Sequence, residues 1–233
     1  ACRHASRTAA LYAVIAVGLG SALLFYSVYW SSYAHAWTAL AVTAFVSYWD
    51  RTRGRYDARR WAALGALAGL AALTRMQEVL WVALPAGEAA IEFGRRVRRR
   101  DFPGIARLAL AAGAATLCSL CVASPELLAN KLVFGRWLAV YTGESYMRWE
   151  APFFWETLFA TKNGLFVWTP VAYIGALGLL LAPRGPSRGL AVGSGAGFLL
   201  QTWVNGSAWA WWSAWSYSNR RFLGVTVVLV LGV

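Results

Sequence analysis

Long stretches without charged side chains dominate the pattern of this chain. In residues 8–34, 163–183 and 189–219, which hold 27, 21 and 31 positions, the only ionisable side chains are tyrosines. About 18 consecutive apolar residues are enough for a helix to cross the hydrocarbon core of a bilayer. The stretches do not alternate between polar and apolar positions, as the strands of a transmembrane barrel do. The pattern therefore predicts an all-α, polytopic transmembrane helical bundle.

The bundle is expected to contain about seven spans and a truncated eighth. We place the helices at residues 9–30, 33–49, 58–74, 77–92, 103–124, 163–182 and 188–204, with the eighth starting near residue 222. The linkers 49–60 and 93–102 are rich in arginine, and short loops of this kind stay in the cytoplasm. An even number of crossings must separate them, which requires two helices between residues 58 and 92. We expect a multi-pass protein of the bacterial cell (inner) membrane with the lipid bilayer as its partner.

Composition supports the membrane assignment. Hydrophobic residues make up 59% of the 233 residues and charged residues 14%, whereas a typical soluble domain has about 25% charged residues. The net charge of +12 lies mostly in the expected cytoplasmic loops. The arginine runs are therefore expected to face anionic lipid headgroups, and a nucleic-acid partner is not expected. Residues 1–233 are expected to form a single transmembrane domain. Because the chain begins at Ala1 and ends within a short apolar run, we expect a fragment of a longer protein.

The turn Thr74-Arg75-Met76-Gln77-Glu78 is the first candidate site at the expected outer face. Ionisable residues at the ends of membrane helices are costly and indicate function, and a plain turn would favour Gly, Asn or Pro. The planar guanidinium of Arg75 suits a lipid-linked phosphate, and Gln77 and Glu78 lie beside it in sequence. The alternative is an Arg75–Glu78 ion pair that only closes the turn.

The aromatic segment that ends in Asn219, Arg220 and Arg221 is the second candidate site. It contains tryptophan at positions 209, 211, 212 and 215. An interfacial aromatic belt explains most of these residues, but the positive-inside rule disfavours two arginines at the outer face. Aromatic faces beside arginine and amide donors suit a sugar or a polyprenyl phosphate.

Two single residues complete the candidate set. Lys162 can join the phosphate-binding residues or simply anchor a helix at the interface. His35 can act as a donor or base near neutral pH, or be a buried histidine with satisfied hydrogen bonds. The other histidine, His4, falls on the cytoplasmic side, so no metal site is expected. No cofactor is evident, and the sequence does not support a divalent cation.

Four motifs follow one another along the chain: Tyr33-Ala34-His35-Ala36, Thr74-Arg75-Met76-Gln77-Glu78, Asn163-Gly164-Leu165-Phe166-Val167-Trp168-Thr169-Pro170 and Trp215-Ser216-Tyr217-Ser218-Asn219-Arg220-Arg221-Phe222. Their order and spacing resemble bacterial membrane proteins of the GT-C glycosyltransferase superfamily, the group related to dolichyl-phosphate-mannose protein mannosyltransferases. The resemblance covers nearly the whole chain.

The resemblance implies an enzyme that transfers a sugar from a polyprenyl-phosphate-linked donor to an acceptor on the extracytoplasmic face. In such enzymes an Asp or Glu of the first extracytoplasmic loop typically serves as the catalytic base. No aspartate falls on the expected outer face, so we expect the fragment to lack that loop and the helix before it, and no catalytic residue is named. The alternatives are a transporter or flippase for a lipid-linked sugar, or a non-catalytic membrane homologue.

Overall fold

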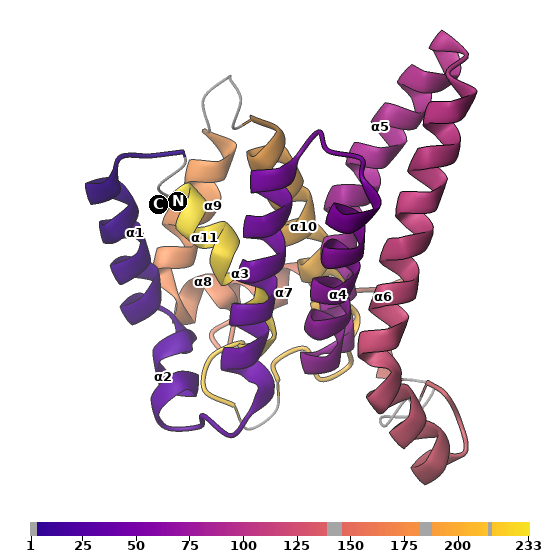
Figure 1. The fold of residues 1–233 in the computed structure, drawn as a ribbon. Coiled ribbons are helices and arrows are strands. Elements are labelled where there is room, and N and C mark those ends of the chain that lie inside the picture. Colours follow the sequence, from indigo (N-terminus) through magenta and orange to yellow (C-terminus); the bar gives the residue numbers. More distant parts are fainter. Residues whose placement is uncertain (1–3, 139–145, 182–187, 214–215) are drawn as a thin grey trace. The chain divides into compact units, whose positions relative to one another are not determined.

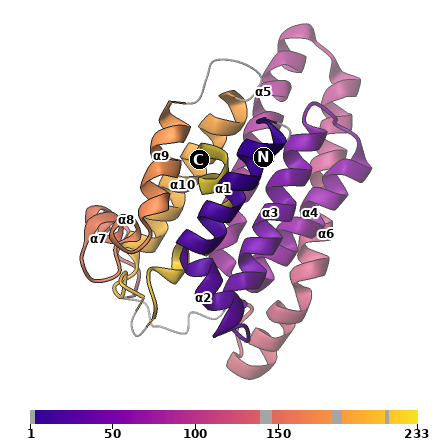
Figure 2. The same ribbon diagram turned by 90° about the vertical axis from the view of Figure 1, so that its left-hand side faces the viewer.

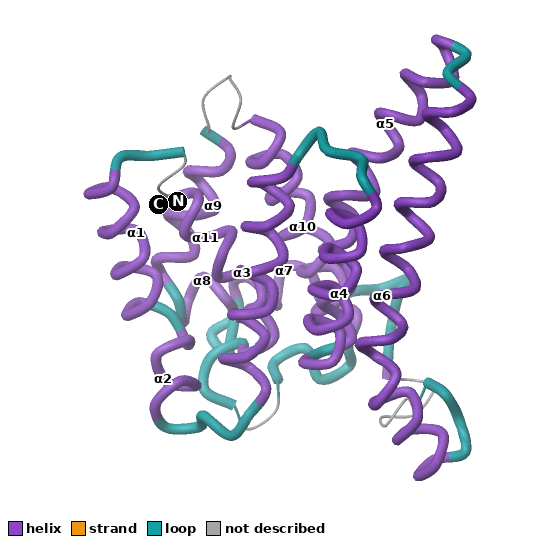
Figure 3. Tube along the Cα trace, in the orientation of Figure 1, coloured by secondary structure: helices purple, strands orange, loops and turns teal. Residues whose placement is uncertain are grey.

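The computed structural model of the chain describes residues 4–138, 146–181, 188–213 and 216–233 (Figures 1 and 3). Its helical elements are α1 (Arg7–Gly20), α2 (Ala22–Val28), α3 (Ala34–Thr52), α4 (Ala58–Thr74), η1 (Met76–Val82), α5 (Ala83–Arg99), α6 (Phe102–Phe134), α7 (Phe154–Phe159), α8 (Leu165–Trp168), α9 (Pro170–Leu180), α10 (Arg188–Ser207), η3 (Arg220–Val225) and α11 (Thr226–Gly232). The described residues form no β-strand beyond one isolated bridge between Met147 and Ala208. The described chain is thus all-helical, as its pattern predicts.

The chain divides into two compact units, and the division falls within α3. We call residues 1–39 and 142–233 the terminal unit, and residues 40–141 the central unit. The terminal unit brings the two ends of the chain together and contains α1, α2 and every element from α7 onward. The central unit contains the rest of α3 together with α4, η1, α5 and α6.

The expectation of seven spans and a truncated eighth is wrong. Among the described residues, α6 is the one helix that is both long and apolar enough to cross a membrane, and α1 with α2 would be a second only if this bent pair counts as one span. The helices α3 and α10 have 19 and 20 residues, but polar positions along them keep their mean hydropathy too low. Outside α6, the predicted spans are therefore either too short or too polar to cross a membrane as single helices.

Local capping explains why the apolar stretches break. Ser21 takes an extended conformation, and its hydroxyl accepts a hydrogen bond from Leu23 N at 3.2 Å, so it starts α2. The axes of α1 and α2 are bent by 69° at this residue. Thr169 is also non-helical, and Pro170 begins α9 directly after it. The resulting 11-residue α9 rises about 17 Å, which is short of the roughly 30 Å hydrocarbon core.

In the central unit, α4 and α6 run side by side (Figure 2). Gly65 and Gly69 of α4 form a Gly-xxx-Gly pair, a spacing that lets two helix backbones approach closely. They face Ala115 and Ser119 of α6. Next to this contact, Trp61 packs with Leu108 and with neighbouring alanines.

In the terminal unit, α9 packs on α11 through backbone contacts at Gly175, Gly178 and Gly232. Backbone hydrogen bonds also join the segment before α7 to the end of α10. Arg148 N donates to Ser207 O at 2.6 Å, and Phe153 N donates to Gly206 O at 2.9 Å. These contacts hold the aromatic residues that follow α10 against the rest of the unit.

Candidate functional site

An aromatic cluster in the terminal unit surrounds His35. The His35 ring lies 4.7 Å from the Tyr26 ring and is stacked parallel to the Tyr33 ring at 5.9 Å. The Tyr26 hydroxyl donates to Tyr217 O at 3.1 Å, and Tyr217 stacks on Phe25 at 4.6 Å. His35 itself is buried. The first and last motifs of the sequence therefore meet in one cluster.

The loop before η3 is held by side-chain amides. Asn163 Nδ2 donates to Trp212 O at 2.7 Å and to Ser216 O at 3.2 Å. Asn219 accepts from the Ser213 hydroxyl at 3.1 Å and donates to Trp211 O at 3.3 Å. Both asparagines are buried. Asn219, a predicted substrate-binding residue, thus uses its amide to shape the loop rather than to offer a free donor.

Three basic candidates lie around this loop. Arg220 is half-buried and interacts with the Tyr26 side chain. The Arg221 guanidinium donates to the Tyr146 hydroxyl and lies over its ring. Lys162 is exposed, and its ammonium group is 4.3 Å from the centre of the Trp212 ring. The structure therefore gathers His35, Lys162, Asn219, Arg220 and Arg221 in the terminal unit. Trp215 lies outside the described residues.

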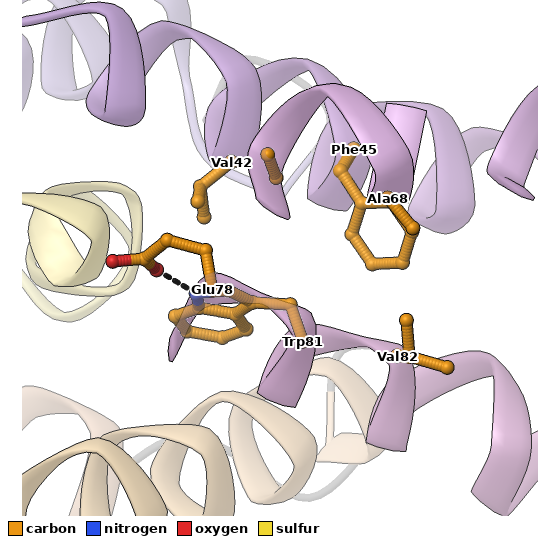
Figure 4. A pocket seen from close by; sticks show the side chains of 7 residues that line it. Val42, Phe45, Ala68, Glu78, Trp81 and Val82 are labelled. Atoms are coloured by element: carbon orange, nitrogen blue, oxygen red, sulfur yellow. Dashed lines mark hydrogen bonds between the residues drawn. The ribbon is translucent and has the colours of Figure 1, made fainter. Parts of the chain in front are cut away.

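The remaining candidates, Arg75, Gln77 and Glu78, belong to the central unit. Arg75 Nη2 donates to Gln77 Oε1 at 3.2 Å. The Glu78 side chain is only 1% exposed and accepts a hydrogen bond from Trp81 Nε1 at 3.0 Å. Glu78 also lines a small apolar pocket together with Val42, Phe45, Ala68, Ala71, Trp81 and Val82. Figure 4 shows these side chains and the hydrogen bond between Trp81 and the Glu78 carboxylate.

Burial raises the pKa of Glu78 from its usual 4.5 to about 7, although the positive charge of Arg75 and the hydrogen bond from Trp81 act in the opposite direction. A carboxyl group that is protonated near neutral pH can donate a hydrogen bond as well as accept one. Within the turn, Arg75 donates to Gln77 and Glu78 accepts from Trp81, so each side chain has a hydrogen-bond partner of its own.

The raised pKa of Glu78 predicts a pH-dependent stability. Between about pH 4.5 and 7 the folded state keeps the proton and the unfolded state loses it. The free energy of unfolding therefore falls as the pH rises through this window, by up to about 3 kcal/mol. In thermal unfolding at pH 5 and pH 8, Glu78→Gln should lose this part of the pH dependence, because glutamine keeps an acceptor for Trp81 without a charge. Glu150→Gln, at an exposed position, should retain it. Equal pH dependence in the wild type and Glu78→Gln would contradict the assignment.

Sequence reasoning missed a buried ionic network in the central unit. Arg60 ends the linker 49–60 that is predicted to be cytoplasmic, but its side chain is fully buried. It donates to Glu88 Oε2 at 2.7 Å, to Thr52 Oγ1 at 3.0 Å and to Arg55 O at 2.6 Å. The signal was Glu88, a carboxylate in an otherwise apolar run, which indicates a buried partner.

The described residues contain no group of three or more His, Cys, Asp or Glu side chains that could hold a metal ion. Comparison of the chain with protein-family models, with curated proteins and with solved structures finds no match.

Proposed function

We propose that the protein transfers a sugar from a polyprenyl-phosphate-linked donor to an acceptor hydroxyl, as a glycosyltransferase of the kind that its motifs resemble. The observation that carries the proposal is the convergence of three distant motifs in the terminal unit. His35 contacts Tyr26, Tyr26 bonds to Tyr217, and Asn163 bonds to the backbone of Ser216. Motifs that contribute to one binding site are expected to contact one another in the folded chain, as these three do.

The cluster has the chemistry that such a donor requires. In the proposed reaction the bond between the anomeric carbon and the phosphate oxygen breaks, and the acceptor oxygen forms a bond to the same carbon. The acceptor's proton passes to a carboxylate base, and the electron pair of the broken bond stays on the leaving phosphate. Arg220 stabilises that charge, as a charge-assisted donor does. Tyr217 is nearly half exposed, so the part of its ring that Phe25 does not cover can pack against a sugar.

A lipid-linked donor requires a bilayer, and α6 supports the proposed location in a bacterial cell membrane. Its 33 residues rise about 50 Å, which exceeds the hydrocarbon core. Only 11% of its apolar window is buried against the rest of the chain. A core helix of a soluble protein would be covered, so we assign the exposed surface of α6 to lipid.

The test is donor turnover in membranes that hold the natural protein, with polyprenyl-phosphomannose and polyprenyl-phosphoglucose as probes. Arg220→Ala should reduce the release of polyprenyl phosphate about 10- to 100-fold, which corresponds to one lost charge-assisted contact. Arg220→Lys should restore part of the activity. Arg188→Ala removes an exposed arginine at the start of α10 and should leave the rate unchanged. Equal rates for Arg220→Ala and wild type at equal protein amounts would refute the phosphate-binding role.

A transporter for the same lipid-linked sugar is the second candidate, because helices broken at Ser21 and Thr169 are typical of transport proteins. The two functions differ in the fate of the donor. A transferase cleaves it and releases polyprenyl phosphate, whereas a transporter delivers the intact molecule to the other leaflet.

A further inference from the structure

Five arginines lie at the end of α5, and two of them, Arg95 and Arg96, bond to neighbouring groups of the central unit. Arg95 and Arg96 pair with Glu92, at 3.7 Å and 2.8 Å, and Arg96 also donates to Gly104 O at 2.6 Å. These bonds fix the turn between α5 and α6. The next arginines, at positions 98, 99 and 100, are all exposed. We call these three residues the basic patch.

An apolar stripe leads along α5 to the basic patch. Ala86, Ala90, Phe93 and Val97 recur at the spacing of one helix face, and all four are exposed. Phe93 and Val97, the two large members, are 49% and 48% exposed. The opposite face holds Glu88 and the other groups that bond within the central unit. The stripe is therefore a surface that the described part of the chain leaves uncovered.

The stripe and the patch lie at the start of α6, whose apolar window is only 11% buried. Asp101 caps α6 through a hydrogen bond from Gly104 N at 2.9 Å. Phe102 and Leu110 in the following turns are each 71% exposed. Figure 1 shows α5 and the first part of α6 as neighbouring rods joined by a tight turn. Where α6 enters a bilayer, the basic patch comes to the level of the headgroups.

We propose that the α5–α6 hairpin is a binding site for anionic phospholipids, independent of sugar transfer. The basic patch pairs with lipid phosphates, and Phe93 and Val97 enter the boundary between headgroups and acyl chains. A basic helix with a large apolar face is typical of segments that lie in a membrane interface. The same arginines would also attract nucleic acid, but a phosphate backbone in water offers nothing to cover the apolar stripe. The stripe thus favours a lipid surface.

Native mass spectrometry of the full chain in mild detergent tests the site, with phosphatidylglycerol and phosphatidylcholine as probes. Phosphatidylglycerol should bind more tightly. Each basic residue near an anionic surface contributes about fivefold in affinity, so changing Arg98, Arg99 and Arg100 together to glutamine should weaken phosphatidylglycerol binding about 100-fold. The matched triple lysine variant keeps the charge and should bind like the wild type. Arg136→Gln, at an exposed position beyond the other end of α6, should also bind normally.

Further measurements distinguish binding of anionic lipid from unselective lipid binding and from RNA binding. Phe93→Ser should weaken phosphatidylglycerol binding without removing the preference over phosphatidylcholine. The proposal is overturned if the two lipids bind equally, if the glutamine variant binds like the wild type, or if a short RNA duplex displaces the lipid at equal concentration. Thermal unfolding of the lysine and glutamine variants separates lost binding from lost folding, because the arginines of the patch are exposed and both variants should unfold at the wild-type midpoint.

Discussion

Replacing Glu88 with alanine should lower the free energy of unfolding by about 3–5 kcal/mol, the usual cost of leaving one member of a buried ion pair alone. Glu88 Oε2 accepts from both Arg60 and Trp49 Nε1, at 2.7 Å and 2.8 Å, and Oε1 accepts from Gly54 N at 2.8 Å. The change would leave the fully buried Arg60 guanidinium without its counter-charge and two further donors without this acceptor. The measurement is the unfolding midpoint and transition of the purified full chain in detergent.

Two control variants test whether the effect of Glu88→Ala comes from leaving the charge of Arg60 unpaired. Glu92→Ala removes a neighbouring carboxylate of the same helix, which pairs with the exposed Arg95 and with the largely buried Arg96. Because Arg96 keeps the Gly104 carbonyl as an acceptor, this change should cost less than Glu88→Ala, about 1–3 kcal/mol. The double change Arg60→Met with Glu88→Leu removes both charges and should be less destabilising than Glu88→Ala alone. A Glu88→Ala protein as stable as Glu92→Ala would show that the buried network does not hold the central unit together.

Alanine at both Gly65 and Gly69 should destabilise the chain by about 2–6 kcal/mol, since overpacking costs about 1–3 kcal/mol per site. A methyl group at Gly65 would collide with the backbone carbonyl of Ala115. A methyl group at Gly69 would lie 2.6 Å from the carbonyl oxygen of Ser119. Both obstacles are backbone atoms of α6, so a side-chain rotation cannot relieve them and the two helices must separate.

Gly113→Ala is the matched control for this helix contact. Gly113 lies on α6, and a methyl group there meets no atom within 4 Å. Alanine at this position should be neutral or stabilising by up to about 1 kcal/mol, because it forms helix better than glycine. Thermal unfolding of both variants checks the contrast. If the double variant Gly65→Ala with Gly69→Ala is as stable as Gly113→Ala, the close contact between the backbones of α4 and α6 is contradicted.

The sequence pattern predicts the helices well and their lengths poorly. The third predicted helix, 58–74, matches α4 at both ends. Its start is fixed by Asp57, whose carboxylate accepts a hydrogen bond from Arg60 N at 3.0 Å. The sixth, 163–182, is instead split at Thr169 into α8 and α9. A window of hydropathy sums composition over a stretch, whereas one residue with non-helical backbone angles ends a helix. Part of the overestimate of membrane spans follows from this difference, and the polar positions of α3 and α10 account for another part.

The candidate residues were found more readily than their roles. Charge and aromatic density marked Arg220 and His35, and the structure places both beside Tyr26. The same reasoning could not show that Asn219 has a different role from these two residues. A polar residue in a loop looks the same in the sequence whether its side chain binds a ligand or bonds to the backbone of its own loop. The bonds of Asn219 to Ser213 and Trp211 depend on a fold that the sequence pattern does not specify.

Donor turnover by the natural protein is the most direct test of the proposed function. Membranes that contain the protein, supplied with radiolabelled polyprenyl-phosphomannose or polyprenyl-phosphoglucose, should release polyprenyl phosphate and pass the label to an acceptor. Membranes without the protein should do neither. If the labelled donor stays intact, or crosses to the other leaflet without being cleaved, the protein is not the transferase proposed here.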